Sequence, residues 1–262
     1  VKEYYILFLI MVIGTYAAFL SLDVFFFYFA HEIAAIPTFL LIAIWGSGKR
    51  EYAAIKLTLY LVAGAGLALV GLIALYFAAG INSFDLIQIQ QQLALHPIPV
   101  DIQNWIFPLI VVGFGITLTL WPFHTWAPVG YASAPTAVSM MHAGILKKMG
   151  AYAIIRFAIQ LMPEAAHTWM PVIATLAVVN ILFCGLVALT QRDLKYVLAY
   201  SSCSHMGYIL LGLACFNTIG LNGVVLLMFA HGIMAALAFA LSGFIEDQTK
   251  TRSLDELGGL LK

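Results

Sequence analysis

The chain has 262 residues, of which 63% are hydrophobic and only 9% are charged, against about 45–50% and about 25% in ordinary globular proteins. A soluble fold of this size could not bury so much apolar surface, so the composition indicates a membrane protein. Twelve basic and twelve acidic residues leave no net charge, which excludes the basic surface that a nucleic-acid-binding protein needs.

Hydrophobic stretches divide the chain into candidate spanning helices. A helix needs about 20 apolar residues to cross a hydrocarbon core about 30 Å thick. The first stretch is too long for the hydrophobic region of a signal peptide and has no small-residue cleavage site, so it also predicts a spanning helix. The sequence therefore predicts one all-α, polytopic transmembrane domain, with eight helices at residues 4–22, 24–45, 55–80, 103–122, 136–161, 168–190, 196–216 and 219–244.

The longest connection follows the third predicted helix. Its apolar residues Leu86, Ile89 and Leu93 are separated by polar ones, a pattern typical of a short helix lying on the membrane surface.

Prolines interrupt the fourth predicted helix and delay the fifth. Pro122, Pro128 and Pro135 occur within 14 residues, and proline removes a helical hydrogen bond. Broken helices at membrane depth are typical of transporters. The alternative is a tight re-entrant turn at the cytoplasmic face. Both interpretations place His124 near the inner mouth.

Basic residues indicate the orientation, because cytoplasmic loops are enriched in lysine and arginine. If the first helix starts in the cytoplasm, only Arg156 lies near the outer face, and Lys147 and Lys148 stand inside a membrane helix. The remaining basic residues all fall on the inner side: Lys2, Lys49, Arg50, Lys56, Arg192, Lys195, Lys250, Arg252 and Lys262.

Four ionisable residues lie near the midpoints of predicted helices: Glu32, Lys148, His205 and His231. A charge at the bilayer centre costs about 2.5–3.5 kcal/mol on insertion scales, so such residues generally mark ion or proton paths. Two alternatives remain. Glu32 and Lys148 could form one structural ion pair, and the histidines, including His142, could simply hydrogen-bond neighbouring helices.

No cofactor or metal site is expected. Cys184, Cys203 and Cys215 lie in hydrophobic stretches without metal-ligand spacing, so we interpret them as small packing residues. The sequence carries no flavin, quinone or iron–sulfur signature.

Four long motifs closely resemble the antiporter-like membrane subunits of respiratory complex I, of the chain M type, with related chains in Mrp cation/proton antiporters and membrane-bound hydrogenases. They are FAHEIAAIPTFLLIAIWG, PFHTWAPVGYASAPTAVSMMHAGILKKMGAYAIIRF, QRDLKYVLAYSSCSHMGYILLGL and MFAHGIMAALAFALSGFIED. The resemblance implies two inverted five-helix repeats, each with a broken helix. Residues 1–161 would be the first repeat and residues 168–262 an incomplete second, so the sequence is expected to be a fragment of a longer subunit.

The resemblance also implies roles for individual residues. Glu32 and Lys148 match proton-carrying positions, and His205 and His231 match polar positions that extend the hydrophilic axis. The family usually has a lysine five residues before Pro122, paired with the glutamate, and this chain has Thr117 there. We therefore expect the additional Lys147 to supply the missing cation as the ionic partner of Glu32, with Thr117 at most a hydrogen-bond donor.

The implied function is proton translocation as a non-redox subunit of an NADH:quinone oxidoreductase in the inner cell membrane, together with other membrane subunits. Two alternatives stay open. One is a subunit of an Mrp-type antiporter or membrane-bound hydrogenase, and the other is a structural coupling subunit without its own proton path.

Overall fold

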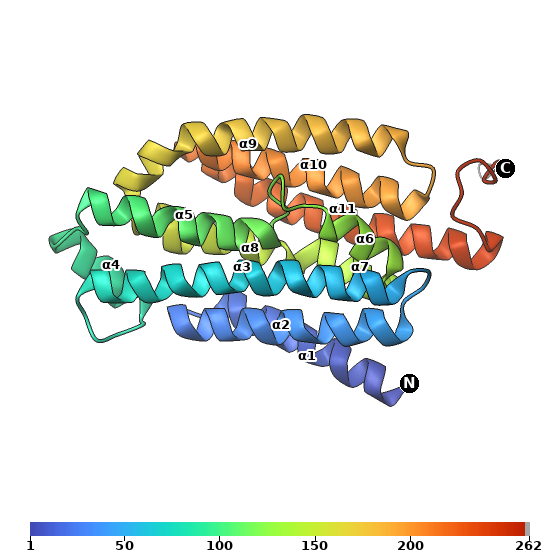
Figure 1. Cartoon of the computed structure of the whole chain (residues 1–262), viewed down its shortest axis with the longest axis horizontal. Helices are drawn as coiled ribbons and strands as arrows, with labels where there is room; N and C mark the ends of the chain where they lie inside the picture. The colour runs from blue at the N-terminus through green and yellow to red at the C-terminus, as the bar shows by residue number, and fades with distance from the viewer. Residues whose placement is uncertain (260–262) are drawn as a thin grey trace.

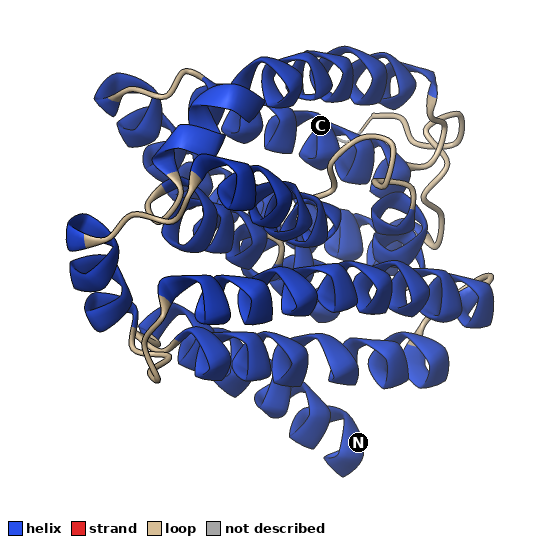
Figure 2. Ribbon diagram, turned by 60° about the vertical axis from the view of Figure 1, so that its left-hand side comes forward, coloured by secondary structure: helices blue, strands red, loops and turns tan. Residues whose placement is uncertain are grey.

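The computed structural model describes residues 1–259, which form helices and connecting loops without a β-strand (Figure 2). Among these described residues, seven helices are long and apolar enough to cross a membrane. The predicted all-α transmembrane bundle is thus confirmed, with spans α1 (Lys2–Leu20), α2 (Val24–Trp45), α3 (Arg50–Ala79), α5 (Val100–Thr117), α9 (Pro163–Thr190), α10 (Leu194–Ala214) and α11 (Thr218–Thr249).

The remaining predicted span, residues 136–161, is a composite helix. It consists of α7 (Thr136–Met141), the π-helical η1 (His142–Leu146), α8 (Lys148–Ala153) and the π-helical η2 (Ile154–Ile159). Each π turn holds an additional residue, and such turns are frequent at functional sites. One of them ends directly before the two lysines.

The broken helix is interrupted in the middle of the bundle. After α5, residues 118–125 are irregular, and α6 (Trp126–Ser133) then packs between α3 and α10. Along α3, Gly64 lies against Gly113 of α5, and Leu57 lies against Gly130 of α6. The break therefore falls near the middle of α3, and the alternative of a turn at the cytoplasmic face is wrong.

The short surface helix is also present, as α4 (Leu86–Leu95), with Leu86 and Ile89 on its buried side. The N-terminus, the α2–α3 and α9–α10 connections and the C-terminal segment lie at one end of the bundle (Figure 1). We call this the inner end, because the basic residues assigned to the cytoplasm lie in or next to these segments, except Lys262, which lies outside the described residues.

One connection occurs twice, at opposite ends of the bundle. Asp23 caps the start of α2 and pairs with Asp85 in an isolated β-bridge, and Asp193 caps the start of α10 and pairs with Ser253 in the same way. The flanking backbone bonds repeat as well: Val24 donates to Phe84 at 2.9 Å, and Leu194 donates to Arg252 at 3.0 Å.

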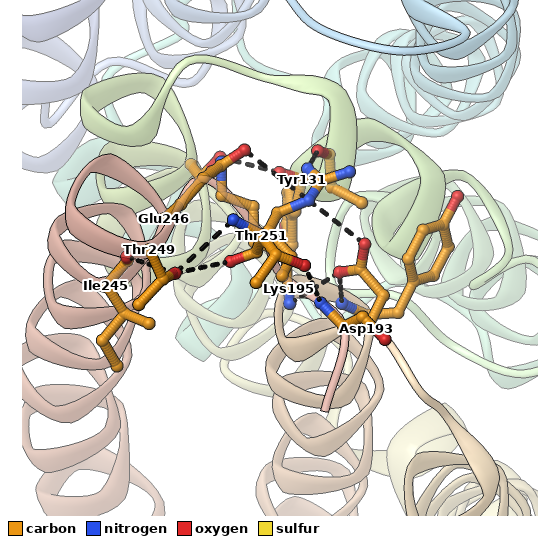
Figure 3. A network of polar contacts seen from close by, with 12 residues as sticks. Tyr131, Asp193, Lys195, Ile245, Glu246, Thr249 and Thr251 are labelled. Carbon is orange, nitrogen blue, oxygen red and sulfur yellow. Dashed lines mark hydrogen bonds and ion pairs between the residues drawn. The ribbon is translucent and has the colours of Figure 1, made fainter. Parts of the chain in front are cut away.

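At the inner end, charged side chains hold α6, α10 and α11 together (Figure 3). Lys195 pairs with Glu246 at 2.8 Å, and Arg252 pairs with Asp193 at 3.2 Å. Arg252 also donates to the carbonyl of Ala132 at 2.7 Å. These contacts fix the helices that carry the buried polar residues described below.

Candidate functional site

Lys147 is completely buried and faces α10. Its ammonium donates a hydrogen bond of 2.9 Å to Ser202 Oγ. It also lies 5.2 Å from the centre of the Tyr131 ring, within the range of a cation–π contact. These two neighbours hold a side chain that has no route to water along the helix surface.

Lys148 faces α11 instead. Its Nζ lies 2.8 Å from Nδ1 of His231, and it also donates to the carbonyl of Ala143. Both side chains are nearly completely buried. The ammonium is therefore bound to an imidazole and a backbone carbonyl, without a carboxylate beside it.

Ser202 connects the two lysines. Its hydroxyl lies 3.1 Å from Nε2 of His231, so hydrogen bonds run without interruption through Lys147, Ser202, His231 and Lys148. We call these four residues the central row. A hydroxyl and an imidazole can each donate and accept, so the central row can pass a proton from one amine to the other.

The expected ion pair of Lys147 with Glu32 is wrong. Adjacent residues of an α-helix point about 100° apart, and the structure satisfies this by giving each lysine a partner on a different later helix. Lys147 reaches α10 and Lys148 reaches α11, and neither faces the carboxylate on α2. The alternative of a Glu32–Lys148 ion pair is not observed either among residues 1–259.

Glu32 forms a separate group with two other side chains. Its Oε1 lies 2.9 Å from Nδ1 of His31, and Nε2 of His31 makes a long contact of 3.5 Å with Oγ1 of Thr117. His31 and Thr117 are buried, whereas Glu32 is 23% exposed. His31 is thus the hydrogen-bond partner of the carboxylate, and Thr117 contacts that partner.

His205 adjoins the central row without being hydrogen-bonded to it. Its ring centre lies 5.1 Å from that of His231, and its Nδ1 lies 2.8 Å from the carbonyl oxygen of Ser201. The structure therefore places His205 beside His231, as an extension of the row.

Two further histidines are buried without protein partners for either ring nitrogen. His142 packs against the rings of Trp126 and Tyr131, each at 5.6 Å. His124 packs against Phe183 at 5.5 Å and is 2% exposed. It packs against side chains of α9 and α10, and its place near an inner mouth stays a prediction.

Within residues 1–259, no group of three histidine, cysteine, aspartate or glutamate side chains is arranged to hold a metal ion. All three cysteines are free, with Cys184 and Cys203 buried and Cys215 exposed. The polar chemistry of the interior is therefore that of lysine, histidine, glutamate and hydroxyl groups.

A family profile described as the NADH:quinone oxidoreductase/Mrp antiporter transmembrane family matches residues 21–262. The chain belongs to this family. Among its relatives are two NAD(P)H-quinone oxidoreductase chains 4. The one from Picosynechococcus sp. is 40% identical over 99% of this chain and 46% of the relative, and the one from Synechocystis sp. is 38% identical over 99% of this chain and 49% of the relative. The chain thus spans about half the length of these family members.

Chains of three solved complexes share the fold. A chain of respiratory complex I from Thermus thermophilus is similar with a TM-score of 0.83 and 28% identity, over 90% of this chain and 50% of that one. A chain of an archaeal membrane-bound sulfane sulfur reductase gives a TM-score of 0.88 and 25% identity, over 97% and 52%. A chain of the Mrp complex from Dietzia sp. has the same fold, with a TM-score of 0.84 at 24% identity, over 98% and 47%.

Sequence reasoning missed Ser202, which holds the central row together. A single serine in an apolar helix has no titratable group and no characteristic spacing. One signal was available: Ser202 precedes His205 by three residues, so the two lie on one face of the helix.

Proposed function

We propose that this chain is the proton-translocating part of an antiporter-like subunit of an NADH:quinone oxidoreductase. The observation that carries the proposal is the central row: two buried lysines joined by a serine and a histidine inside a membrane-spanning bundle. A bundle can be packed without buried charges, and ionisable groups at this depth are costly to insert. A proton path explains why they are present.

The central row would work by exchanging protons between its two amines. A positive charge on either lysine disfavours a second positive charge nearby, so a proton arriving at Lys147 favours release from Lys148. Ser202 and His231 lie between the two amines and can each accept one proton while donating another. His205, beside His231, would continue the path.

Partner subunits would supply the redox chemistry. The relatives from cyanobacteria are chains of NAD(P)H-quinone oxidoreductases, and the relative of known structure from Thermus thermophilus is part of respiratory complex I. We therefore assign NADH oxidation and quinone reduction to other subunits, and charge movement across the inner cell membrane to this one.

The chain would contain one whole inverted repeat and part of a second. The repeated Asp-capped connection, at opposite ends of the bundle, supports this division. Residues 1–161 would be the first repeat and residues 168–262 the beginning of the second.

The proposal is tested with Lys148→Ala in the complete subunit, assembled in its complex in membrane vesicles. Protons translocated per NADH oxidised should fall to a small fraction of the unaltered value, while the complex still assembles. The matched control is Lys49→Ala, because Lys49 is exposed at the start of α3. Normal translocation by an assembled Lys148→Ala complex would favour a structural coupling subunit.

A second candidate function is cation/proton exchange in an Mrp-type antiporter, or proton translocation in a related reductase or hydrogenase. The shared fold of the Mrp complex and the sulfane sulfur reductase supports it. Isolation of the complete subunit with its partners separates the candidates, because only the oxidoreductase assembly would oxidise NADH with a quinone.

A further inference from the structure

We propose that His31 and His142 form a two-imidazole relay that carries protons between Glu32 and Lys147, with a bound water as the hydrogen-bond partner of His142. This inference rests on the proposed function, because it supplies the central row with protons from Glu32, the carboxylate on the spanning helix α2. It assigns proton-transfer roles to two histidines, neither of which belongs to the central row.

The first step is the contact at Glu32. The carboxylate is bonded to Nδ1 of His31 at 2.9 Å, and the opposite nitrogen of the same ring lies 3.5 Å from Oγ1 of Thr117. Both nitrogens of the imidazole therefore have a neighbour: Nδ1 points toward the carboxylate, and Nε2 points toward the broken helix. A ring held in this way can receive a proton at one nitrogen and release one from the other.

The second step is the environment of His142. Its side chain is 1% exposed, and neither ring nitrogen has a protein partner. The hydroxyl of Tyr131, whose ring packs against His142, is buried and unpartnered as well. A neutral imidazole always carries one N–H, and a buried polar group without a partner costs about 1–3 kcal/mol. Buried waters generally satisfy such groups.

The third step is the position of His142 between the two sites. Trp126 packs against His142 and donates to the carbonyl of Ile116, the residue before Thr117, at 3.0 Å. On the other side, the Tyr131 ring contacts both His142 and the ammonium of Lys147. One packed group of aromatic rings thus extends from the backbone next to Thr117 to Lys147, and His142 is the histidine within it.

The proton transfers balance as follows. A protonated Glu32 gives its proton to Nδ1 of His31 and becomes a carboxylate, while His31 releases the proton on Nε2 to the bound water. The water passes a proton to one nitrogen of His142, and the proton on the other nitrogen of His142 moves through a second bound water to the neutral amine of Lys147. Both imidazoles end neutral, with the proton on the opposite nitrogen, and rotation of the rings resets them.

The test uses His31→Gln and His142→Phe in the complete subunit within its complex. Phenylalanine keeps the ring that packs against Trp126 and Tyr131 but has no nitrogen. We expect both variants to oxidise NADH and to translocate only a small fraction of the normal number of protons per NADH. His96→Phe is the control, because His96 is exposed in an outer connection.

A rescue experiment separates proton transfer from packing. Adding Thr117→Lys to His31→Gln places an ammonium beside Glu32, at the residue that His31 contacts. We expect translocation to recover substantially. The change does not restore the packing of the His31 ring against Phe114, so recovery would come from the ammonium and not from packing. Normal translocation by His31→Gln and His142→Phe, with translocation lost in Lys148→Ala, overturns the relay and leaves the proposed function standing. Failure of the rescue overturns the role of His31, and normal translocation by Lys148→Ala contradicts the proposed function itself.

Discussion

At the scale of single residues, one hydroxyl group connects a buried lysine to the histidine that binds a second one. Ser202 accepts from Lys147 at 2.9 Å and lies 3.1 Å from His231, which in turn binds Lys148. The two lysines are adjacent in sequence but bind different helices. Their amines are therefore connected by hydrogen bonds through this serine and histidine.

Ser202→Ala should therefore impair proton translocation although it removes only one oxygen atom. The ammonium of Lys147 would lose its hydrogen-bond acceptor, at a cost of about 1–3 kcal/mol, and the row would be interrupted. Proton translocation per NADH and the thermal unfolding midpoint of the assembled complex should both decrease. The matched control is Ser201→Ala, because Ser201 contacts His205 through its backbone carbonyl. Equal behaviour of the two variants would contradict the role of Ser202.

Lys147→Leu should lose most translocation, and adding Thr117→Lys should not restore it. The reason is that Lys147 bonds to Ser202, whereas Thr117 lies beside His31 and Glu32. The same Thr117→Lys change is expected to rescue His31→Gln, so the two double variants are assayed together. Recovery in the Lys147→Leu background would show that Lys147 serves Glu32 after all.

Sequence alone located the ionisable residues but not their partners. Lys148 and His231 stand out because a charge in an apolar stretch is rare, and the structure brings them together. The direction of Lys147 depends on how the composite helix is rotated. The π turn of η1 changes that rotation, and the hydrophobic periodicity of the sequence does not indicate where a π turn occurs.

At the scale of elements, the lysine-bearing helix is fixed against the broken one by a glycine. A Cβ atom at Gly150 would lie 2.5 Å from the carbonyl oxygen of Phe114 and 3.1 Å from the amide of Leu118. Phe114 lies in the last turn of α5, and Leu118 is the first residue of the break. The close approach therefore sets where α8, and the lysine at its start, can lie.

Gly150→Ala should destabilise the subunit by about 1–3 kcal/mol, the usual cost of overpacking, because backbone atoms cannot move aside as flexible side chains do. The thermal unfolding midpoint of the complex measures the effect. Gly66→Ala is the matched control, since a Cβ atom there has no neighbour within 4 Å. A Gly150→Ala complex as stable as this control would rule out the close approach.

Most of the elements could be predicted because length and hydropathy decide which segments cross a bilayer. The second predicted helix matches α2 residue for residue, and the cluster around Pro122 correctly indicated a break. The depth of that break could not be read from the sequence, because it depends on how α3 packs against both halves. Gly64 and Leu57 provide this information only in the folded chain.

At the scale of the whole molecule, the two Asp-capped connections relate the polar sites to one another. Glu32 and Ser202 each follow their capping aspartate, Asp23 or Asp193, by nine residues. They therefore occupy corresponding places in helices of opposite direction. In one half of the bundle this place holds a carboxylate beside His31, and in the other it holds the hydroxyl that binds Lys147.

The central claim is that Lys148 and His231 carry protons as members of one row. The most direct measurement is the number of protons translocated per NADH oxidised by the complex with Lys148→Ala, with His231→Phe and with both changes together. Groups that act as a unit give non-additive losses, so the double variant should translocate about as little as either single variant. Near-normal translocation by either single variant, or losses that multiply in the double variant, would contradict the claim.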